Sequence, residues 1–199
     1  MLSNLLHETV THLVLAGSAL LLAVLLGAPI AIATAKTRLV RSLTLGGVGV
    51  ARSLPTIAIL ALLLPWLGVG RIPAIVALAL LALPPIVVSI DAGLRALPAA
   101  ASEIADSLGI APRTRFLRLE IPVAVPFALA GIRTASVECI ASATLATFVG
   151  GGGLGDSIVR GLQTGNDTLL VAASALVAAL AFGGDALLGL ALRATEGGA

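Results

Sequence analysis

Long stretches without a single charged residue constrain this chain more than any other feature. The uncharged runs cover residues 13–35, 53–70, 72–90, 139–155 and 168–184. A transmembrane helix needs about 20 mostly apolar residues, and several of these runs approach or exceed that length. The sequence therefore predicts five membrane-spanning helices, at about 13–35, 43–66, 72–90, 123–147 and 168–192. Arg52 interrupts the second predicted span, and Arg133 and Glu138 interrupt the fourth.

The composition excludes a water-soluble chain. Hydrophobic residues make up 58% of the 199 residues and charged residues 11%, whereas soluble domains have about 45–50% and about 25%. The net charge of +2 is too small for a surface that binds nucleic acid. Only helices and closed barrels span a membrane, and the sequence lacks the alternation typical of barrel strands. We therefore expect an all-α, polytopic membrane protein in which residues 1–199 form a single transmembrane domain.

The basic residues indicate how the chain is oriented in the membrane, because cytoplasmic loops carry an excess of Lys and Arg. Eight of the twelve basic residues lie on one side of the predicted spans: Lys36, Arg38, Arg41, Arg95, Arg113, Arg115, Arg118 and Arg193. This side is predicted to be cytoplasmic. A multi-pass protein of the cell membrane is then expected to have its N-terminus outside and its C-terminus in the cytoplasm. The first apolar run is longer than a cleavable signal core, so we expect it to remain as an anchor.

The cytoplasmic loop over residues 91–122 is the most polar part of the chain, and two short helices are predicted in it. Gly109 suits the residue after a helix end, where φ is often positive, and Pro112 suits the start of a second helix. Two helices joined at a glycine would form a knob under the membrane. The side chains available to a partner are apolar or charged: Glu103, Ile104, Asp106, Leu108, Arg113, Arg115 and Arg118. Such a knob suits docking on another protein, or contact between its arginines and anionic membrane lipid.

Within this loop the sequence resembles the EAA loop of the permease subunits of ABC importers. That motif reads Glu-Ala-Ala, three residues, Gly, nine residues, then Ile-x-Leu-Pro. The spacing is matched here by Glu103-Ile104-Ala105, Gly109 and Leu119-Glu120-Ile121-Pro122, with apolar replacements at Ile104, Leu119 and Ile121. The resemblance implies a type I ABC-importer permease fold similar to that of methionine permeases. It also implies that Glu103, Ala105, Gly109 and Pro122 belong to a region that couples to a separate ATP-hydrolysing subunit.

Other segments resemble particular branches of this class. Arg52-Ser53-Leu54-Pro55 is similar to the Arg-Ser-x-Pro of small permeases. The segments 130–135, 148–156 and 161–167 are similar to the osmoprotectant branch, which imports glycine betaine, choline and carnitine. The resemblance thus implies an osmoprotectant importer that alternates between inward-open and outward-open forms.

A translocation pathway or outer gate is expected at Arg52, Ser53, Pro55, Arg133, Glu138, Phe148 and Gly151. Charged residues inside a membrane are costly and usually face protein or water. Arg133 and Glu138 are five positions apart, so they do not share a helix face, and each should find a partner on another helix or subunit. The intramembrane charges can equally be structural, as buried pairs between helices or as side chains that reach the interface.

The sequence provides no pattern for catalysis, a metal site or a cofactor. Lys36 is the only lysine and lacks the preceding glycines of an ATP-binding loop, so ATP hydrolysis is expected on a separate subunit. His7 and His12 have no cysteines or carboxylates at ligand spacing. The run Gly-Gly-Gly-Gly-Leu-Gly at 150–155 fits a dinucleotide-binding pattern only formally, and we expect a tight external turn or re-entrant segment there.

The partners follow from what the chain lacks. One Trp and four Phe are too few to form a cage for a quaternary ammonium group, so cargo recognition is expected on an external substrate-binding protein. Five spans are too few for a symmetric pathway, which implies a second permease subunit, identical or similar, together with two ATP-binding subunits. Two alternatives remain: a permease for an amino acid such as methionine, and a membrane assembly subunit that translocates nothing.

Overall fold

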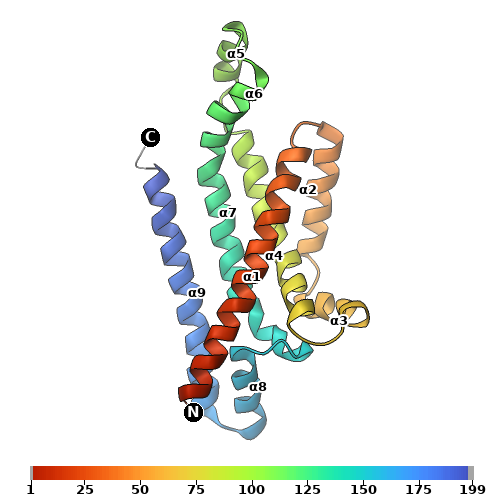
Figure 1. Ribbon diagram of the computed structural model, residues 1–199, viewed down its shortest axis with the longest axis vertical. Coiled ribbons are helices and arrows are strands. Elements are labelled where there is room, and N and C mark those ends of the chain that lie inside the picture. The colour runs from red at the N-terminus through yellow and green to blue at the C-terminus, as the bar shows by residue number, and fades with distance from the viewer. Residues whose placement is uncertain (1, 197–199) are drawn as a thin grey trace.

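The computed structural model describes residues 2–196, which form helices and their connections (Figure 1). The long helices are α1 (Leu2–Thr34), α4 (Arg71–Leu94), α7 (Ile121–Ser142) and α9 (Asp167–Glu196). The shorter helices are α2 (Arg38–Arg52), α3 (Thr56–Leu67), α5 (Ala99–Ser107), α6 (Pro112–Arg115) and α8 (Leu154–Thr164). A π-helical turn η1 (Phe116–Glu120) precedes α7, and a 3₁₀ helix η2 (Ala143–Val149) follows it.

Four helical segments of the described chain are long and apolar enough to span a membrane: Asn4–Thr34, Arg71–Leu94, Pro112–Val149 and Asp167–Thr195. The helices α2 and α3 together form a further, broken span, bent by 99°. The all-α, polytopic prediction is therefore confirmed, with four spans or five if the bent pair counts as one.

The second predicted span, over 43–66, is broken in the structure just after the Arg52 that interrupts it. The chain leaves the helix after Arg52, and Pro55 takes an extended conformation (φ −61°, ψ 131°) before α3 begins. Proline lacks an N–H and disfavours helical geometry in the residue before it, so the break falls at this point. Since α2 has 15 residues, it is only about 22 Å long, too short to cross about 30 Å of hydrocarbon alone.

The fourth span also begins earlier than predicted. Instead of a separate short helix before residue 123, α6 continues through η1 into α7 without a break, so this helical segment extends from Pro112 to Val149. Pro112 occupies the first turn of α6, where its missing N–H costs no hydrogen bond. The second helix of the cytoplasmic loop is thus the extended end of a membrane span.

Small residues let the central helices approach closely. The core of α1 contributes Ala16, Ala19 and Ala23, which pack against alanines of α4 and α7. A Cβ added to Gly131 of α7 would lie 2.7 Å from the carbonyl oxygen of Pro85 in α4. Close backbone approach between small residues is the usual basis of helix packing in membranes. Gly131 and its small neighbours therefore hold the bundle of one chain together.

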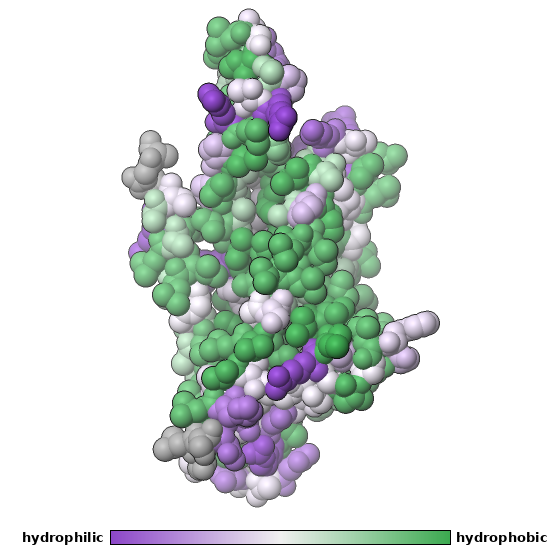
Figure 2. All heavy atoms as spheres, viewed as in Figure 1, coloured by the Kyte–Doolittle hydropathy of each residue, from purple (hydrophilic) through white to green (hydrophobic). Residues whose placement is uncertain are grey.

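The two ends of the bundle differ. The start of α1 and the whole of α8 lie at one end, whereas α5, α6 and the C-terminal end of α9 lie at the other (Figure 1). Apolar residues form a broad band over the middle of the face shown in Figure 2, and most of the hydrophilic residues visible there lie nearer the two ends. This arrangement agrees with a bundle that crosses a membrane along its long axis.

Candidate functional site

The first candidate site is the knob, defined here as residues 98–115, which projects beyond the bundle (Figure 1). Its turn depends on Gly109, which has a φ of +69° that L side chains rarely adopt. The N–H of Gly109 donates to the carbonyl of Asp106 (3.1 Å), and that of Ile110 donates to the carbonyl of Ala105 (3.0 Å). These bonds satisfy carbonyls at the end of α5. The predicted glycine turn between two helices is confirmed.

Arg115 ties the two helices of the knob together. Its Nη1 lies 2.6 Å from Asp106 Oδ1 on α5, and its Nε lies 3.2 Å from Glu120 Oε1 in η1. The sequence singled out both Asp106 and Arg115, and the structure brings them into contact. Arg115 therefore links α5 to η1 across the turn.

The surface of the knob has the character of a docking site. Ile104 and Leu108 lie four positions apart on α5 and its end, with 59% and 71% of their surfaces exposed. Figure 2 shows apolar residues at the tip, above hydrophilic ones at its base. Glu103 and Arg113 are exposed, and among residues 2–196 neither has an ion-pair partner. Ala105 is buried and supports the turn, and Pro122 is exposed and follows η1.

The second candidate site begins at the bend between α2 and α3. Ser53 closes α2, because its hydroxyl donates to the carbonyl of Val50 (2.8 Å). The carbonyl of Pro55 accepts the N–H of Ala58 (2.9 Å) and so starts α3. Ser53 and Pro55 thus shape the bend, whereas the Arg52 side chain reaches across to Glu138 of α7, with Nη2 3.4 Å from Oε1.

One face of α7 is not covered by the rest of the chain. Phe127, Thr134 and Ala141 of α7 are all exposed and follow one another at intervals of seven residues, which places them on one helical face. Glu138 is half-buried and lies four positions after Thr134. A carboxylate facing lipid would be costly. Glu138 is paired with Arg52, and this face with Arg52 is a candidate surface for contact with protein, water or polar cargo.

Two further arginine–carboxylate pairs join the helices with close bidentate geometry. Arg133 of α7 forms two 2.6 Å hydrogen bonds with both carboxylate oxygens of Asp185 in α9. Arg41 of α2 binds both oxygens of Asp91 in α4 at 2.7 Å. Bidentate Arg–carboxylate pairs are strong and geometrically specific. The prediction that Arg133 and Glu138 find partners on other helices is confirmed. The Arg133–Asp185 pair links α7 to α9.

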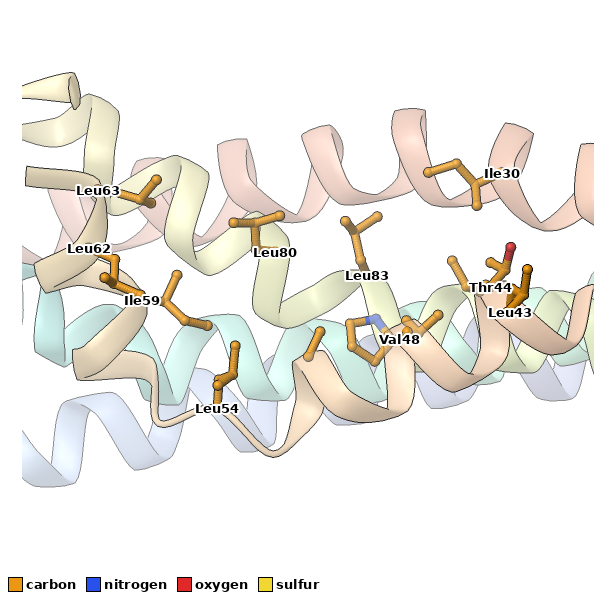
Figure 3. Close-up of a pocket in the computed structure, with 14 residues that line it drawn as sticks. Ile30, Leu43, Thr44, Val48, Leu54, Ile59, Leu62, Leu63, Leu80 and Leu83 are labelled. Carbon is orange, nitrogen blue, oxygen red and sulfur yellow. The ribbon is translucent and has the colours of Figure 1, made fainter. Parts of the chain in front are cut away.

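An apolar cavity of about 500 Å³ separates much of α2 from the bundle. Side chains of α1, α2, α3 and α4 surround it, including Ile30, Val48, Ile59 and Leu83 (Figure 3). No residue of α2 is buried. The helix contacts the bundle through Leu45 and Val48, which pack against the central apolar cluster, and through the Arg41–Asp91 and Arg52–Glu138 pairs near its two ends.

At the opposite end from the knob, η2 leads into a glycine turn. Gly150, Gly152 and Gly153 have positive φ values between 71° and 96°. A Cβ on Gly151 would lie 2.8 Å from the Cβ of Ala146, so this position admits only glycine without rearrangement. Phe148 is exposed beside the turn. The predicted tight turn is confirmed, and it is followed by α8, which the sequence reasoning did not anticipate.

The sequence reasoning also missed a polar cluster beside this turn. Glu8 of α1 accepts hydrogen bonds from Ser157 and from Arg160 (3.2 Å) of α8. His12 is fully buried, and its Nε2 lies 2.8 Å from the carbonyl oxygen of Ile140. Extending the spacing of buried Leu15, Ala19 and Ala23 backwards would have placed both Glu8 and His12 on the core face of α1. The cluster attaches α8 to α1.

Known proteins resemble this chain in sequence. The sequence pattern of the family described as "Binding-protein-dependent transport system inner membrane component" matches residues 12–196. The chain is 35% identical over 190 residues to the choline transport system permease protein OpuBB of Bacillus subtilis (strain 168), covering 96% of this chain and 88% of that one. It is 34% identical over 160 residues to the glycine betaine/carnitine/choline transport system permease protein OpuCB of the same organism, covering 80% and 74%.

The fold is also known from solved structures. The chain superposes on a chain of the MetNI methionine ABC transporter, in an inward-facing conformation, with a TM-score of 0.86. The match covers 98% of this chain and 97% of the other at 22% sequence identity. At this identity the likeness establishes the fold alone, which is that of a type I ABC-importer permease.

Proposed function

The chain belongs to the family of binding-protein-dependent transport system inner membrane components, and we propose that the cargo it carries is glycine betaine, carnitine or choline. It is the transmembrane permease subunit of an ABC importer. The proposed cargo is supported by relatives that cover most of the chain and are named for choline or for glycine betaine, carnitine and choline. The methionine transporter shares the fold, which by itself says nothing of cargo.

The observation that carries the coupling role is the knob. Exposed Ile104 and Leu108 at the tip of a polar projection suit burial in a cleft of a second protein. We assign this partner as the ATP-hydrolysing subunit, with Glu103, Asp106, Arg113 and Arg115 around the apolar contact. Gly109 and Ala105 maintain the turn, and Pro122 lies in the first turn of α7, after η1.

The remaining partners are proposed because this chain provides only one side of a translocation pathway. The uncovered face with Thr134 and Glu138 forms half of a translocation pathway, which a second permease subunit of the same or similar sequence completes. Two ATP-binding subunits dock on the two knobs, and an external substrate-binding protein delivers cargo. The knob then lies in the cytoplasm, and the N-terminal end of α1 lies outside, beside the glycine turn with Phe148 and Gly151. Closure of the ATPase subunits would bias the permease pair between its two access states.

The proposed cargo is tested with the complex reconstituted in proteoliposomes with its ATPase subunit and binding protein. Uptake of labelled glycine betaine is measured in competition with unlabelled carnitine, choline or methionine. We expect carnitine or choline to compete and methionine not to. Competition by methionine alone would overturn the cargo assignment, whereas a complex that stimulates no ATP hydrolysis and imports nothing would support the non-translocating alternative.

A further inference from the structure

The Arg52–Glu138 pair differs from the other two arginine–carboxylate pairs that join apolar spans. Arg41–Asp91 and Arg133–Asp185 each form two hydrogen bonds of 2.6–2.7 Å. Arg52 and Glu138 share a single contact of 3.4 Å between Nη2 and Oε1. One fork of the Arg52 guanidinium and the second carboxylate oxygen of Glu138 thus remain available to other groups.

The pair is also accessible, and its arginine is more exposed, at 60%, than Arg133 at 38% or Arg41 at 27%. The Arg52 side chain is 60% exposed, and the side chain of Glu138 is 27% exposed on the uncovered face of α7. Arg52 is the last residue of α2 before the 99° bend. The adjacent cavity extends to Ala51 and Leu54 on either side of it, so this end of α2 is not wedged against the bundle. A loosely held ion pair at such a place can open at little cost.

We propose that this pair exchanges partners with a zwitterionic cargo, so that Arg52 binds the cargo carboxylate while Glu138 faces its quaternary ammonium group. The inference rests on the proposed function. It assigns recognition of the two cargo charges to the permease itself. Glycine betaine and carnitine carry both groups. Choline carries only the cation and, in place of a carboxylate, a hydroxyl group.

The chemistry of the two residues matches the two ends of such a cargo. A planar guanidinium presents paired N–H donors that fit a carboxylate. A quaternary ammonium group has no N–H to donate, so a negatively charged carboxylate can attract it only by charge. When the pair opens around a zwitterion, each protein charge exchanges one opposite charge for another. No unpaired charge is then left in apolar surroundings, which is the costly outcome when a buried pair is broken.

Choline cannot take part in both exchanges, because it has no carboxylate. It can satisfy Glu138, but it leaves Arg52 without a counter-charge. The wild-type permease should therefore pass zwitterions more readily than choline once the binding protein is saturated with either. Removing the charge of Arg52 should abolish this advantage, because the carboxylate of the zwitterion would lose its partner while the cation of choline would lose nothing.

The test compares Arg52→Gln with Arg71→Gln in the reconstituted complex. Arg71 is exposed at the start of α4, and no ion pair to it occurs within residues 2–196, so it is a matched arginine control. Uptake of glycine betaine and of choline is measured at saturating concentrations, together with ATPase activity and subunit assembly. We expect Arg52→Gln to lower the betaine-to-choline uptake ratio about tenfold, the size expected for one charge-assisted hydrogen bond. Arg71→Gln should leave the ratio unchanged, and Glu138→Gln should slow both cargoes.

The outcomes separate the two proposals. If the wild-type complex imports neither compound, the proposed function fails and this inference falls with it. If the wild type imports both and Arg52→Gln slows them equally or not at all, the pair is only a link between α2 and α7 and the inference alone is overturned. Arg52→Lys provides a second check, because it keeps the charge but loses the fork. It should give an intermediate ratio if Arg52 contacts cargo.

Discussion

The two ends of this bundle differ in an unusual way: one exposes apolar side chains, and the other buries polar ones. The knob exposes apolar Ile104 and Leu108 beyond the membrane-spanning bundle. The polar cluster beside the glycine turn, which the proposed orientation places outside and which is called the outer cluster here, buries Glu8, His12 and Ser157. Exposed apolar surface is stabilised only when a partner covers it. Buried polar groups are mostly hydrogen-bonded, and here Glu8 accepts from Ser157 and Arg160 while His12 Nε2 meets the carbonyl of Ile140, although His12 Nδ1 has no partner within residues 2–196. The tip of the knob thus suits the proposed contact with a partner, whereas the outer cluster links α1 to α8 within the chain.

This contrast predicts that equivalent changes at the two ends will have different consequences. Damage to the outer cluster should lower the stability of the isolated subunit. Damage to the knob should leave that stability intact and weaken the association with the ATPase subunit. The single cysteine, Cys139, is fully buried, so its labelling by a thiol reagent on heating reports unfolding of either variant.

The largest effect is expected for Glu8→Ala. This change removes the acceptor of both the Ser157 hydroxyl and Arg160, and we expect it to lower the free energy of unfolding by about 2 kcal/mol. The matched change Glu103→Ala removes an exposed carboxylate on the knob and should leave the temperature of Cys139 labelling unchanged. Equal labelling temperatures for the two variants would contradict the division of roles.

A smaller effect is expected at the turn of the knob. Gly109→Val places a β-branched side chain at a φ of +69°, at a cost of about 1–2 kcal/mol. Because the side chain itself meets open space, the strain should reshape the turn and reduce ATPase subunit recovered in a pull-down by about tenfold. Asn tolerates positive φ, so Gly109→Asn is the control and should retain most of the binding. Full recovery with the Val variant would show that the turn does not set the docking geometry.

The smallest effect is expected for Asp106→Asn. Asp106 lies 2.6 Å from Arg115, but its side chain is 63% exposed, and exposed ion pairs contribute at most about 1 kcal/mol. Arg115 would also keep its contact with Glu120. We expect a slight weakening of ATPase association at low salt that disappears at high salt. A loss as large as that of Gly109→Val would mean that Asp106 contacts the partner directly.

Much of the fold was predictable because its signals are local. The uncharged runs predicted the spans, and Gly109 with Pro112 predicted the turn of the knob. The same proline chemistry could have placed the break at Pro55, but proline is often tolerated within membrane helices, so its presence did not decide between a kink and a bend of 99°. The helix α8 was missed because its sequence is short and follows a glycine-rich run.

The candidate site was predictable only in part. The sequence showed that charges at Arg52, Arg133 and Glu138 needed partners, since charge inside a membrane is costly. It could not show that Arg133 meets Asp185 in a tight pair while Arg52 meets Glu138 in a loose one. The seven-residue spacing of Phe127, Thr134 and Ala141 was visible in the sequence. Whether these residues are exposed depends on which helices cover α7. The sequence could not show this, because neighbouring positions carry equally apolar residues.

By itself the sequence determined the class of the protein, its membrane spans and the position of the knob, because hydropathy, proline and glycine act within a few residues. Only the tertiary structure decided which charges pair, which face of α7 stays open and why Glu8 can be buried. Glu8 and Ser157 are 149 positions apart, and Arg52 and Glu138 are 86 apart. Contacts at such separations depend on how whole helices pack. The close approach of small residues in α1, α4 and α7 sets that packing.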